Sequence, residues 1–124
     1  MYHKFILVLL VFLAFTNCSK EEVLYEPQSK VDPYQLYQEG FEAFNKGDYF
    51  YANKKFSEAE LNFDIVEFAA KSAIMSSYAL YGINFHSEAF DNLKRYLKKY
   101  PGDKNVIYAH YLICLLYTSP SPRD

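Results

Sequence analysis

Few residues of this 124-residue chain combine the types and the spacing that catalysis requires. Its three histidines, His3, His86 and His110, lie far apart in the sequence, and no group of His, Cys, Asp and Glu has the spacing of metal ligands. The chain also lacks a glycine-rich phosphate loop and a G-x-S-x-G nucleophile motif. We therefore predict that the protein is not an enzyme, has no metal site and no cofactor, and acts by binding other molecules.

Cys18 is the residue whose position indicates a chemical modification. It closely follows an unbroken apolar run at residues 5–15, which is too short for a membrane-spanning helix of about 20 residues and typical of a secretory signal. A cysteine in this position, followed by a polar segment, resembles the bacterial lipobox, in which the cysteine becomes the lipid-modified first residue of the mature protein. We expect residues 1–17 to be a lipoprotein signal peptide and Cys18 to be the lipidation site. The alternative is an ordinary cleaved signal with an incidental cysteine.

A polar segment separates Cys18 from the folded part of the chain. Residues 18–32 show neither helical nor strand periodicity and are rich in Glu, Ser and Lys, so we expect a flexible, lipid-anchored linker. An Asp directly after the cysteine commonly retains bacterial lipoproteins in the inner membrane. Ser19 stands there instead, which by analogy indicates the outer membrane.

The start of the first helix is strongly marked in the sequence. Asp32 is placed as an N-cap, Pro33 occupies the first helical position, and Gln35 stands where a capping box has its Gln or Glu. Gly47 is placed to end this helix in a left-handed conformation, and Asp48 to cap the next one. The further helices are expected at residues 49–62, 66–81 and 86–100, with another beginning near residue 105.

The apolar residues of these helices repeat. Ala52, Phe56 and Ala59 line one helix face, and Ala89 and Leu93 repeat the pattern 37 residues after Ala52 and Phe56. A turn, a small residue, a large apolar residue and a closing proline resemble the tetratricopeptide (TPR) pattern, whose period is about 34 residues. The second turn is one residue longer before its small residue than the first, which leaves the register of the preceding helix uncertain by one.

We therefore predict an all-α fold, a TPR αα-hairpin solenoid of about two and a half repeats. The repeats are expected at residues 33–64 and 65–101, with the start of a third at 103–113. One set of residues is predicted to pack the repeats together: Gly40, Ala52, Phe56, Ala59, Ala89, Leu93 and Pro101.

Residues 114–124 read as foreign to this pattern. Their last seven residues contain two prolines and no apolar stripe, so we expect them not to continue the helix. They resemble an in-frame translation of the transposase adapter used in shotgun sequencing. We predict that they are not native, which would leave Cys18 as the native cysteine of this chain.

The charged residues exclude one class of partner. A net charge of −2 provides no phosphate-neutralising surface, so we do not expect a nucleic-acid partner. Four basic residues form a run that is most simply a solvated helix face: Lys94, Arg95, Lys98 and Lys99.

The aromatic residues of the first helix are the candidate binding residues. In a TPR the first helix of each hairpin lines the concave surface, and aligning residues 47–49 with the pattern places one set on that face: Tyr34, Tyr37, Phe41, Phe44 and Asn45. An apolar strip at the open end of a solenoid has no preceding repeat to cover it, which favours a groove for a substrate or partner. The alternative is that the strip packs inward and stabilises the first hairpin.

The combination of these features resembles the BamD family, the TPR lipoproteins of the β-barrel assembly machinery of Gram-negative outer membranes. The resemblance rests on the lipobox, the D-P-Y helix start, Tyr-Ala-x-Tyr at residues 78–81, R-Y-L-K-K-Y-P at 95–101 and V-I-Y-A-H-Y-L at 106–112. It spans Phe15 to Ile113 and would cover roughly the first half of a family member.

The resemblance implies a lipoprotein scaffold on the periplasmic face of the outer membrane that assists the folding and insertion of outer-membrane proteins. The implied partners are a BamA-type barrel protein with POTRA domains, other lipoproteins of the assembly complex, unfolded outer-membrane proteins, and the membrane through the lipid anchor. Two alternatives remain open from the sequence. One is another TPR lipoprotein adaptor, such as a pilus-secretin pilotin or a cell-envelope coordinator. The other is an accessory domain of an enzyme whose catalytic part lies elsewhere.

Overall fold

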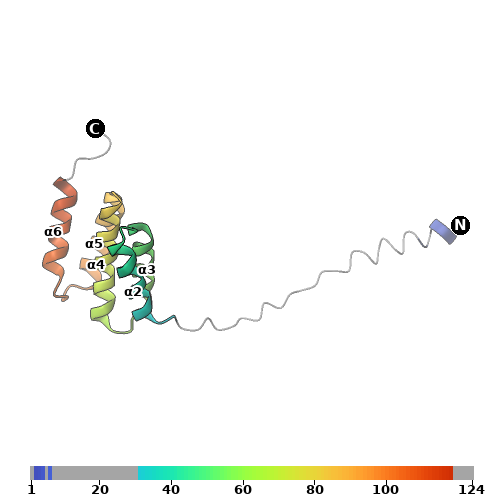
Figure 1. The fold of residues 1–124 in the computed structure, drawn as a ribbon, viewed down its shortest axis with the longest axis horizontal. Helices are drawn as coiled ribbons and strands as arrows, with labels where there is room; N and C mark the ends of the chain where they lie inside the picture. Colours follow the sequence, from blue (N-terminus) through green and yellow to red (C-terminus); the bar gives the residue numbers. More distant parts are fainter. Residues whose placement is uncertain (1, 5, 7–30, 119–124) are drawn as a thin grey trace.

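The computed structural model describes residues 2–4, 6 and 31–118. Residues 31–118 form five α-helices and contain no strand: α2 (Pro33–Asn45), α3 (Tyr49–Asn62), α4 (Val66–Gly82), α5 (His86–Lys99) and α6 (Val106–Thr118). Successive helices run in opposite directions, so α2 with α3 and α4 with α5 form two helical hairpins, and α6 follows them (Figure 1). The predicted all-α hairpin fold is confirmed. Cys18, most of the expected signal peptide and most of the linker lie outside the described residues.

The helix ends follow the local signals of the sequence. Asp32 Oδ1 accepts a hydrogen bond from the Tyr34 backbone N–H at 3.0 Å and caps α2. The expected capping box is wrong in its second half, because Gln35 Nε2 donates to Glu39 Oε1 at 3.0 Å, one helical turn further on. In a capping box the Gln side chain turns back to accept from the N-cap N–H, whereas here it reaches along the helix to donate to the Glu39 carboxylate, a charge-assisted hydrogen bond. None of the helices in the described part of the chain is long and apolar enough to cross a bilayer.

The two hairpins share one register. Three positions recur 37 residues later: the N-cap (Asp48 and Phe85), the first helical residue (Tyr49 and His86) and the small buried residue (Ala52 and Ala89). The one-residue irregularity expected in the second turn is therefore wrong, because His86, rather than Phe85, corresponds to Tyr49. The turn residues follow the same offset. Gly47 has φ +79° and Asn84 has φ +61°, a left-handed conformation that Asn tolerates better than most residues.

The first hairpin closes around a tight helix crossing. Ala52, Phe56 and Ala59 are fully buried. A Cβ atom added to Gly40 would lie 3.0 Å from the Phe56 ring, so glycine allows α2 and α3 to approach closely at this point. Phe56 and Ala52 belong to a core cluster that also contains Ala43 of α2 and Ala79 of α4.

The second hairpin and α6 share a second core cluster. Ala69, Ala70, Ala73 and Ile74 of α4 pack there with Leu93 and Tyr96 of α5, Tyr100, and Ala109 and Leu112 of α6. Ala89 is also fully buried. Pro101, in contrast, lies exposed in the turn between α5 and α6, where it ends α5 and contributes little buried surface.

The end of α6 differs from the expectation. Residues 114–118, predicted not to continue the helix, are helical through Thr118. Leu115 and Leu116 pack against the second core cluster, and the Tyr117 ring meets the Phe90 ring of α5 edge-on at 5.5 Å. The two prolines that suggested a break stand at positions 120 and 122, beyond the last described residue, so the apolar residues before them decide the structure.

Candidate binding face

The residues predicted to form a groove on α2 divide into two kinds. Tyr34 and Phe41 are 48% and 47% exposed. Tyr37 and Phe44 are half-buried, and Asn45 is exposed at the helix end. The helix presents Leu36, Gly40 and Ala43 as its buried residues, so the aromatic residues flank the buried stripe. Some aromatic residues of α2 are therefore exposed on the surface, and the others pack against neighbouring helices.

Tyr37 and Phe44 pack against other elements. The Tyr37 ring lies 5.3 Å from the Phe56 ring of α3, and the Lys71 ammonium of α4 lies 5.2 Å from the Tyr37 ring centroid. The Phe44 ring meets the Tyr49 ring edge-on at 5.0 Å. Both side chains border the first core cluster. The expectation that Tyr37 is as accessible as Tyr34 and Phe41 is not met, because its ring packs against Phe56 and lies under the Lys71 side chain.

The aromatic surface continues beyond α2 onto the first helix of the second hairpin and onto α6. The Phe44 ring stacks on the Tyr78 ring of α4 at 5.3 Å, and the Tyr78 ring meets the Tyr108 ring of α6 at 6.4 Å. Tyr108 and Tyr111 follow along α6 with ring centroids 6.2 Å apart. We call these four residues, Phe44, Tyr78, Tyr108 and Tyr111, the aromatic ladder. It joins three helices that the sequence analysis treated separately.

The rings of the ladder are partly exposed to solvent. Tyr108 is 39% exposed and Tyr111 57% exposed, whereas Phe44 and Tyr78 are half-buried. Burial, together with the neighbouring Tyr78 and Tyr111, raises the pKa of the Tyr108 phenol, so this hydroxyl remains a neutral hydrogen-bond donor at physiological pH. Rings of this kind offer apolar faces with polar tips, which suits a surface that binds apolar segments while in contact with water.

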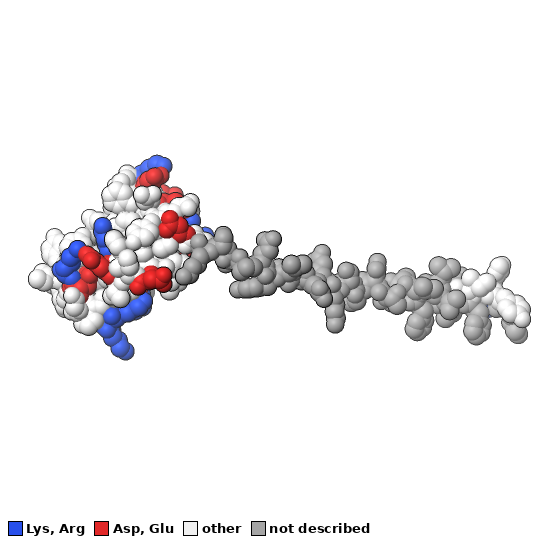
Figure 2. Space-filling view, turned by 90° about the horizontal axis from the view of Figure 1, so that it is seen from below, with Lys and Arg blue, Asp and Glu red and all other residues white. Residues whose placement is uncertain are grey.

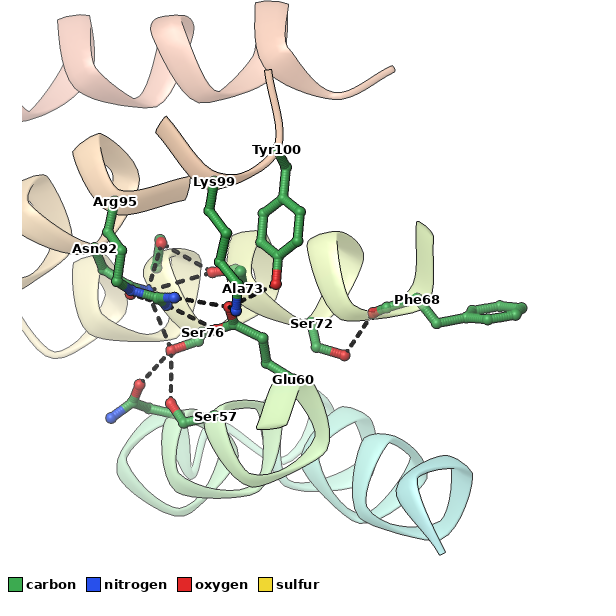
Figure 3. A network of polar contacts seen from close by, with 12 residues as sticks. Ser57, Glu60, Phe68, Ser72, Ala73, Ser76, Asn92, Arg95, Lys99 and Tyr100 are labelled. Carbon is green, nitrogen blue, oxygen red and sulfur yellow. Dashed lines mark hydrogen bonds and ion pairs between the residues drawn. The ribbon is translucent and has the colours of Figure 1, made fainter. Parts of the chain in front are cut away.

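A second functional arrangement joins the repeats through charge. Glu60 of α3 is 5% exposed, and its carboxylate accepts four hydrogen bonds (Figure 3). Arg95 of α5 binds it in a fork, with both Nη–Oε distances 2.7 Å. Lys99 Nζ donates to Oε1 at 3.1 Å, and the Tyr100 hydroxyl donates to the same oxygen at 2.9 Å. We call these four residues the Glu60 cluster.

Neutral side chains extend the Glu60 cluster into α4. Arg95 Nη2 donates to Asn92 Oδ1 at 2.6 Å, and Asn92 Nδ2 donates to Ser77 Oγ at 2.8 Å. Ser76 Oγ donates to Asn53 Oδ1 of α3 at 2.7 Å. Among the described residues, every buried side-chain nitrogen or oxygen has a hydrogen-bond partner. A polar network that is fully satisfied specifies one packing of α3, α4 and α5.

The Glu60 cluster also sets the charge of its members. Burial by itself raises the pKa of Glu60, but the hydrogen bonds from Arg95, Lys99 and Tyr100 outweigh it and hold the pKa below its ordinary value. Burial and the hydrogen bond to Glu60 raise the pKa of the Tyr100 phenol. The carboxylate therefore stays ionised at neutral pH.

This cluster was not predicted from the sequence. Arg95 and Lys99, expected on a solvated helix face, are nearly half exposed but also bind the buried Glu60 carboxylate. Lys94 and Lys98 are exposed. A signal was present: Glu60 lies four residues after Phe56 and eight after Ala52, on the buried stripe of α3, and Arg95 and Lys99 share one face of α5.

Of the residues considered for chemistry, His86 borders the aromatic ladder, because the Tyr81 ring on which it stacks also stacks on Tyr78. His86 stacks on the Tyr81 ring at 5.7 Å, His110 is exposed on α6, and Cys114 is an exposed free thiol. No group of His, Cys, Asp and Glu within the described residues could hold a metal ion.

Comparisons with known proteins place the chain in a family. Residues 29–122 match the model of a family described as YfiO, outer membrane lipoprotein. The chain is 32% identical over 82 residues to a curated protein of Caulobacter vibrioides, the outer membrane protein assembly factor BamD. This alignment covers 66% of the chain and 27% of the relative, so the chain spans about a quarter of that protein's length. No solved structure matches the chain. The family match covers most of the chain, whose helices form the expected TPR-like repeats, and the protein therefore belongs to the YfiO family of outer membrane lipoproteins.

Proposed function

We propose that this chain is part of an assembly factor for outer-membrane proteins, a scaffold that binds partner subunits and unfolded substrate. Family membership and the name of the Caulobacter relative support the setting. The proposed partners are a BamA-type barrel protein with POTRA domains and other lipoproteins of the complex. These assignments favour the assembly role over the pilotin, cell-envelope coordinator and enzyme-accessory alternatives.

The single observation that carries the binding role is the aromatic ladder. Its rings lie 5.3 to 6.4 Å apart from Phe44 to Tyr108. In an extended chain, side chains on the same face repeat every two residues, or about 6.6 Å. An extended segment with apolar side chains at alternate positions can therefore place one side chain at each ring. The strands of an outer-membrane barrel have this alternation, with apolar residues facing the lipid.

Tyr34 and Phe41 extend the proposed binding face along α2. Both rings are about half exposed, so they can gain buried area when a substrate binds. We propose that these two residues contact the substrate together with the rings of the aromatic ladder, while Tyr37 holds the face in place. Asn45 lies exposed beside Phe44 and can donate or accept a hydrogen bond from the substrate backbone.

The binding role is tested with peptides. A peptide with aromatic residues at alternate positions should crosslink to the full chain more strongly than a peptide of the same composition with those residues paired. Phe41→Ala and Tyr111→Ala should each weaken crosslinking of the alternating peptide. Phe50→Ala is the matched control, because Phe50 is an exposed phenyl group on α3, a helix that contributes no residue to the aromatic ladder. Equal crosslinking by both peptides, or an equal loss in the control, would reject this function.

The remaining divisions of the chain are proposals with tests of their own. Residues 1–17 are proposed as the signal peptide, residues 18–32 as the linker and Cys18 as the acylated residue that anchors the protein to the periplasmic face of the outer membrane. The mass of the mature N-terminus tests this, since an unmodified Cys18 would reject the anchor.

Residues 114–124 are proposed as adapter-derived. Amplifying and resequencing the gene would decide, because a native reading frame through these codons would disprove it.

A further inference from the structure

One end of the bundle carries a group of exposed apolar side chains. Leu61, Ile65 and Val66, around the turn between α3 and α4, are 80%, 51% and 67% exposed. Val31, just before α2, is 49% exposed. The start of α2 and this turn lie at the same end of the molecule (Figure 1). Figure 2 looks onto this end and shows uncharged surface interrupted by acidic and basic side chains, several of which lie next to each other.

The same end of the bundle also carries a group of aromatic rings. The Tyr34 ring meets the Phe63 ring edge-on at 5.0 Å and the Phe68 ring at 5.4 Å, and Phe63 stacks on Phe68 at 5.5 Å. Three rings in mutual contact tie α2, the turn and α4 together. We call the seven residues the end patch: Val31, Tyr34, Leu61, Phe63, Ile65, Val66 and Phe68. The ring contacts hold this apolar surface in a fixed arrangement.

The chain itself indicates what faces this patch. Val31 belongs to the patch and is the second-last residue of the linker, so the linker joins the folded part at the end patch. Twelve residues separate Cys18 from Val31, and even fully extended they span only about 40 Å. If Cys18 is acylated, the end patch is the part of the folded domain held nearest to the membrane.

Because the linker is short, even a weak attraction between the end patch and the membrane is enough to keep them in contact. The linker holds the domain at a high effective concentration near its anchor, in the millimolar range for short flexible linkers. A surface that would bind free vesicles poorly can therefore be engaged most of the time in the anchored protein.

The charged residues beside the patch indicate which lipid headgroup charge it can contact. Asp32, Asp64 and Glu67 are neighbours in sequence of Val31, Ile65 and Val66. Glu67 pairs with Lys104 of the turn before α6 at 2.5 Å, so this charge is balanced within the protein. Asp32 caps α2 at the same end through a backbone N–H, so its negative charge favours a zwitterionic lipid surface over an anionic one.

We propose that the end patch rests on the interfacial region of a zwitterionic membrane, the one in which Cys18 is anchored; this rests on the proposed lipidation. Leu61, Ile65 and Val66 enter the headgroup region, and the ring triad holds them in position. The helices then stand with their α3–α4 turn toward the lipid. The turns at Gly47 and Asn84, at the other end of the bundle, point away from the lipid (Figure 1).

Two labelled positions with equal exposure test the proposal. Val66 is 67% exposed in the end patch, and Phe50 is 66% exposed at the opposite end of α3, eleven residues before Leu61 and about 16 Å away along the helix. Each is replaced by Cys in a Cys114→Ser background, because Cys114 is an exposed thiol, and labelled with bimane. The acylated full chain is reconstituted in phosphatidylcholine and phosphatidylethanolamine vesicles that contain brominated lipid.

We expect bromine quenching to be several-fold stronger at position 66 than at position 50, and to decrease at position 66 when phosphatidylglycerol is added. Equal quenching at the two positions would overturn the proposal and leave the patch to a protein partner. Stronger quenching with phosphatidylglycerol would overturn the preference for zwitterionic lipid. The mass of the N-terminus is measured on the same sample. A missing acyl group would reject the anchor, whereas equal quenching in an acylated sample rejects only the membrane contact.

Discussion

The first and second hairpins are joined on two sides by different kinds of side chain. On one side, the Glu60 cluster links α3 to α5 through charged hydrogen bonds of 2.7 to 3.1 Å around a buried carboxylate. On the other, the aromatic ladder links α2, α4 and α6 through rings 5.3 to 6.4 Å apart that are partly exposed to solvent. Charged hydrogen bonds fix distances and angles, whereas ring contacts tolerate sliding and tilting.

This difference separates two tasks of a repeat scaffold. The Glu60 cluster sets the angle between the hairpins, since moving α5 would leave a buried carboxylate without its donors. The aromatic ladder can adapt to a bound segment because no buried polar group depends on its geometry. We infer that rigidity lies on the α3–α5 side and adaptability on the α2–α4–α6 side.

The largest expected effect is that of Glu60→Gln. The amide keeps the size of the side chain but removes the charge that Arg95 and Lys99 contact. Breaking a fully buried pair costs about 3–5 kcal/mol, but both cations are nearly half exposed and can be solvated, so we expect a loss of about 2 kcal/mol. Urea denaturation measures it. Glu42→Gln, on the exposed side of α2, is the control and should change the midpoint little. Equal midpoints for the two variants would show that the cluster does not hold the hairpins together.

Acid should reproduce part of this loss. The folded-state pKa of Glu60 lies below its ordinary value of 4.5, so the folded protein binds fewer protons than the unfolded chain near that pH. The stabilisation is therefore fully present above the ordinary pKa and is lost as the pH falls through the folded-state value. Denaturation midpoints measured from pH 6 downward should fall more steeply for the unmodified protein than for Glu60→Gln. Parallel pH profiles would contradict this account.

Tyr37→Ala tests the packing side of the α2 strip. The ring contacts Phe56 and lies under Lys71, so its removal should lower the free energy of unfolding by about 1 kcal/mol. A Tyr37→Phe variant keeps the ring and should retain most of the stability. Thermal melts of both variants give the measurement. A loss as large as that of Glu60→Gln would mean that the Tyr37 ring contributes as much to the fold as the buried carboxylate.

Phe41→Ala should have the smallest effect on stability. The ring is about half exposed, so we expect a change within about 0.5 kcal/mol. Binding of the alternating peptide should nevertheless weaken, since Phe41 is proposed to contact the substrate. The same thermal melts and the crosslinking assay separate the two effects. A melting temperature that falls with Phe41→Ala as it does with Tyr37→Ala would place Phe41 in the core and remove it from the binding face.

The sequence by itself determined the helices of this protein. Asp32, Pro33, Gly47 and Asp48 act on their own backbone and nearest neighbours, and α3 begins and ends at the predicted residues. The expected ends of α4 and α5 lie within one residue of those observed. The small residues Ala52 and Ala89 mark the helix crossings because only a small side chain fits where two helices meet closely.

Only the tertiary structure decided which polar and aromatic side chains meet. Glu60 and Arg95 are 35 residues apart, and Phe44 and Tyr78 are 34 apart, so their contacts depend on how the hairpins are rotated against each other. Helical periodicity places each residue on a face, but whether a lysine on that face meets water or a buried carboxylate depends on the neighbouring helix. The same reason accounts for α6, whose Leu115 and Leu116 continue the helix because a core is present for them to cover.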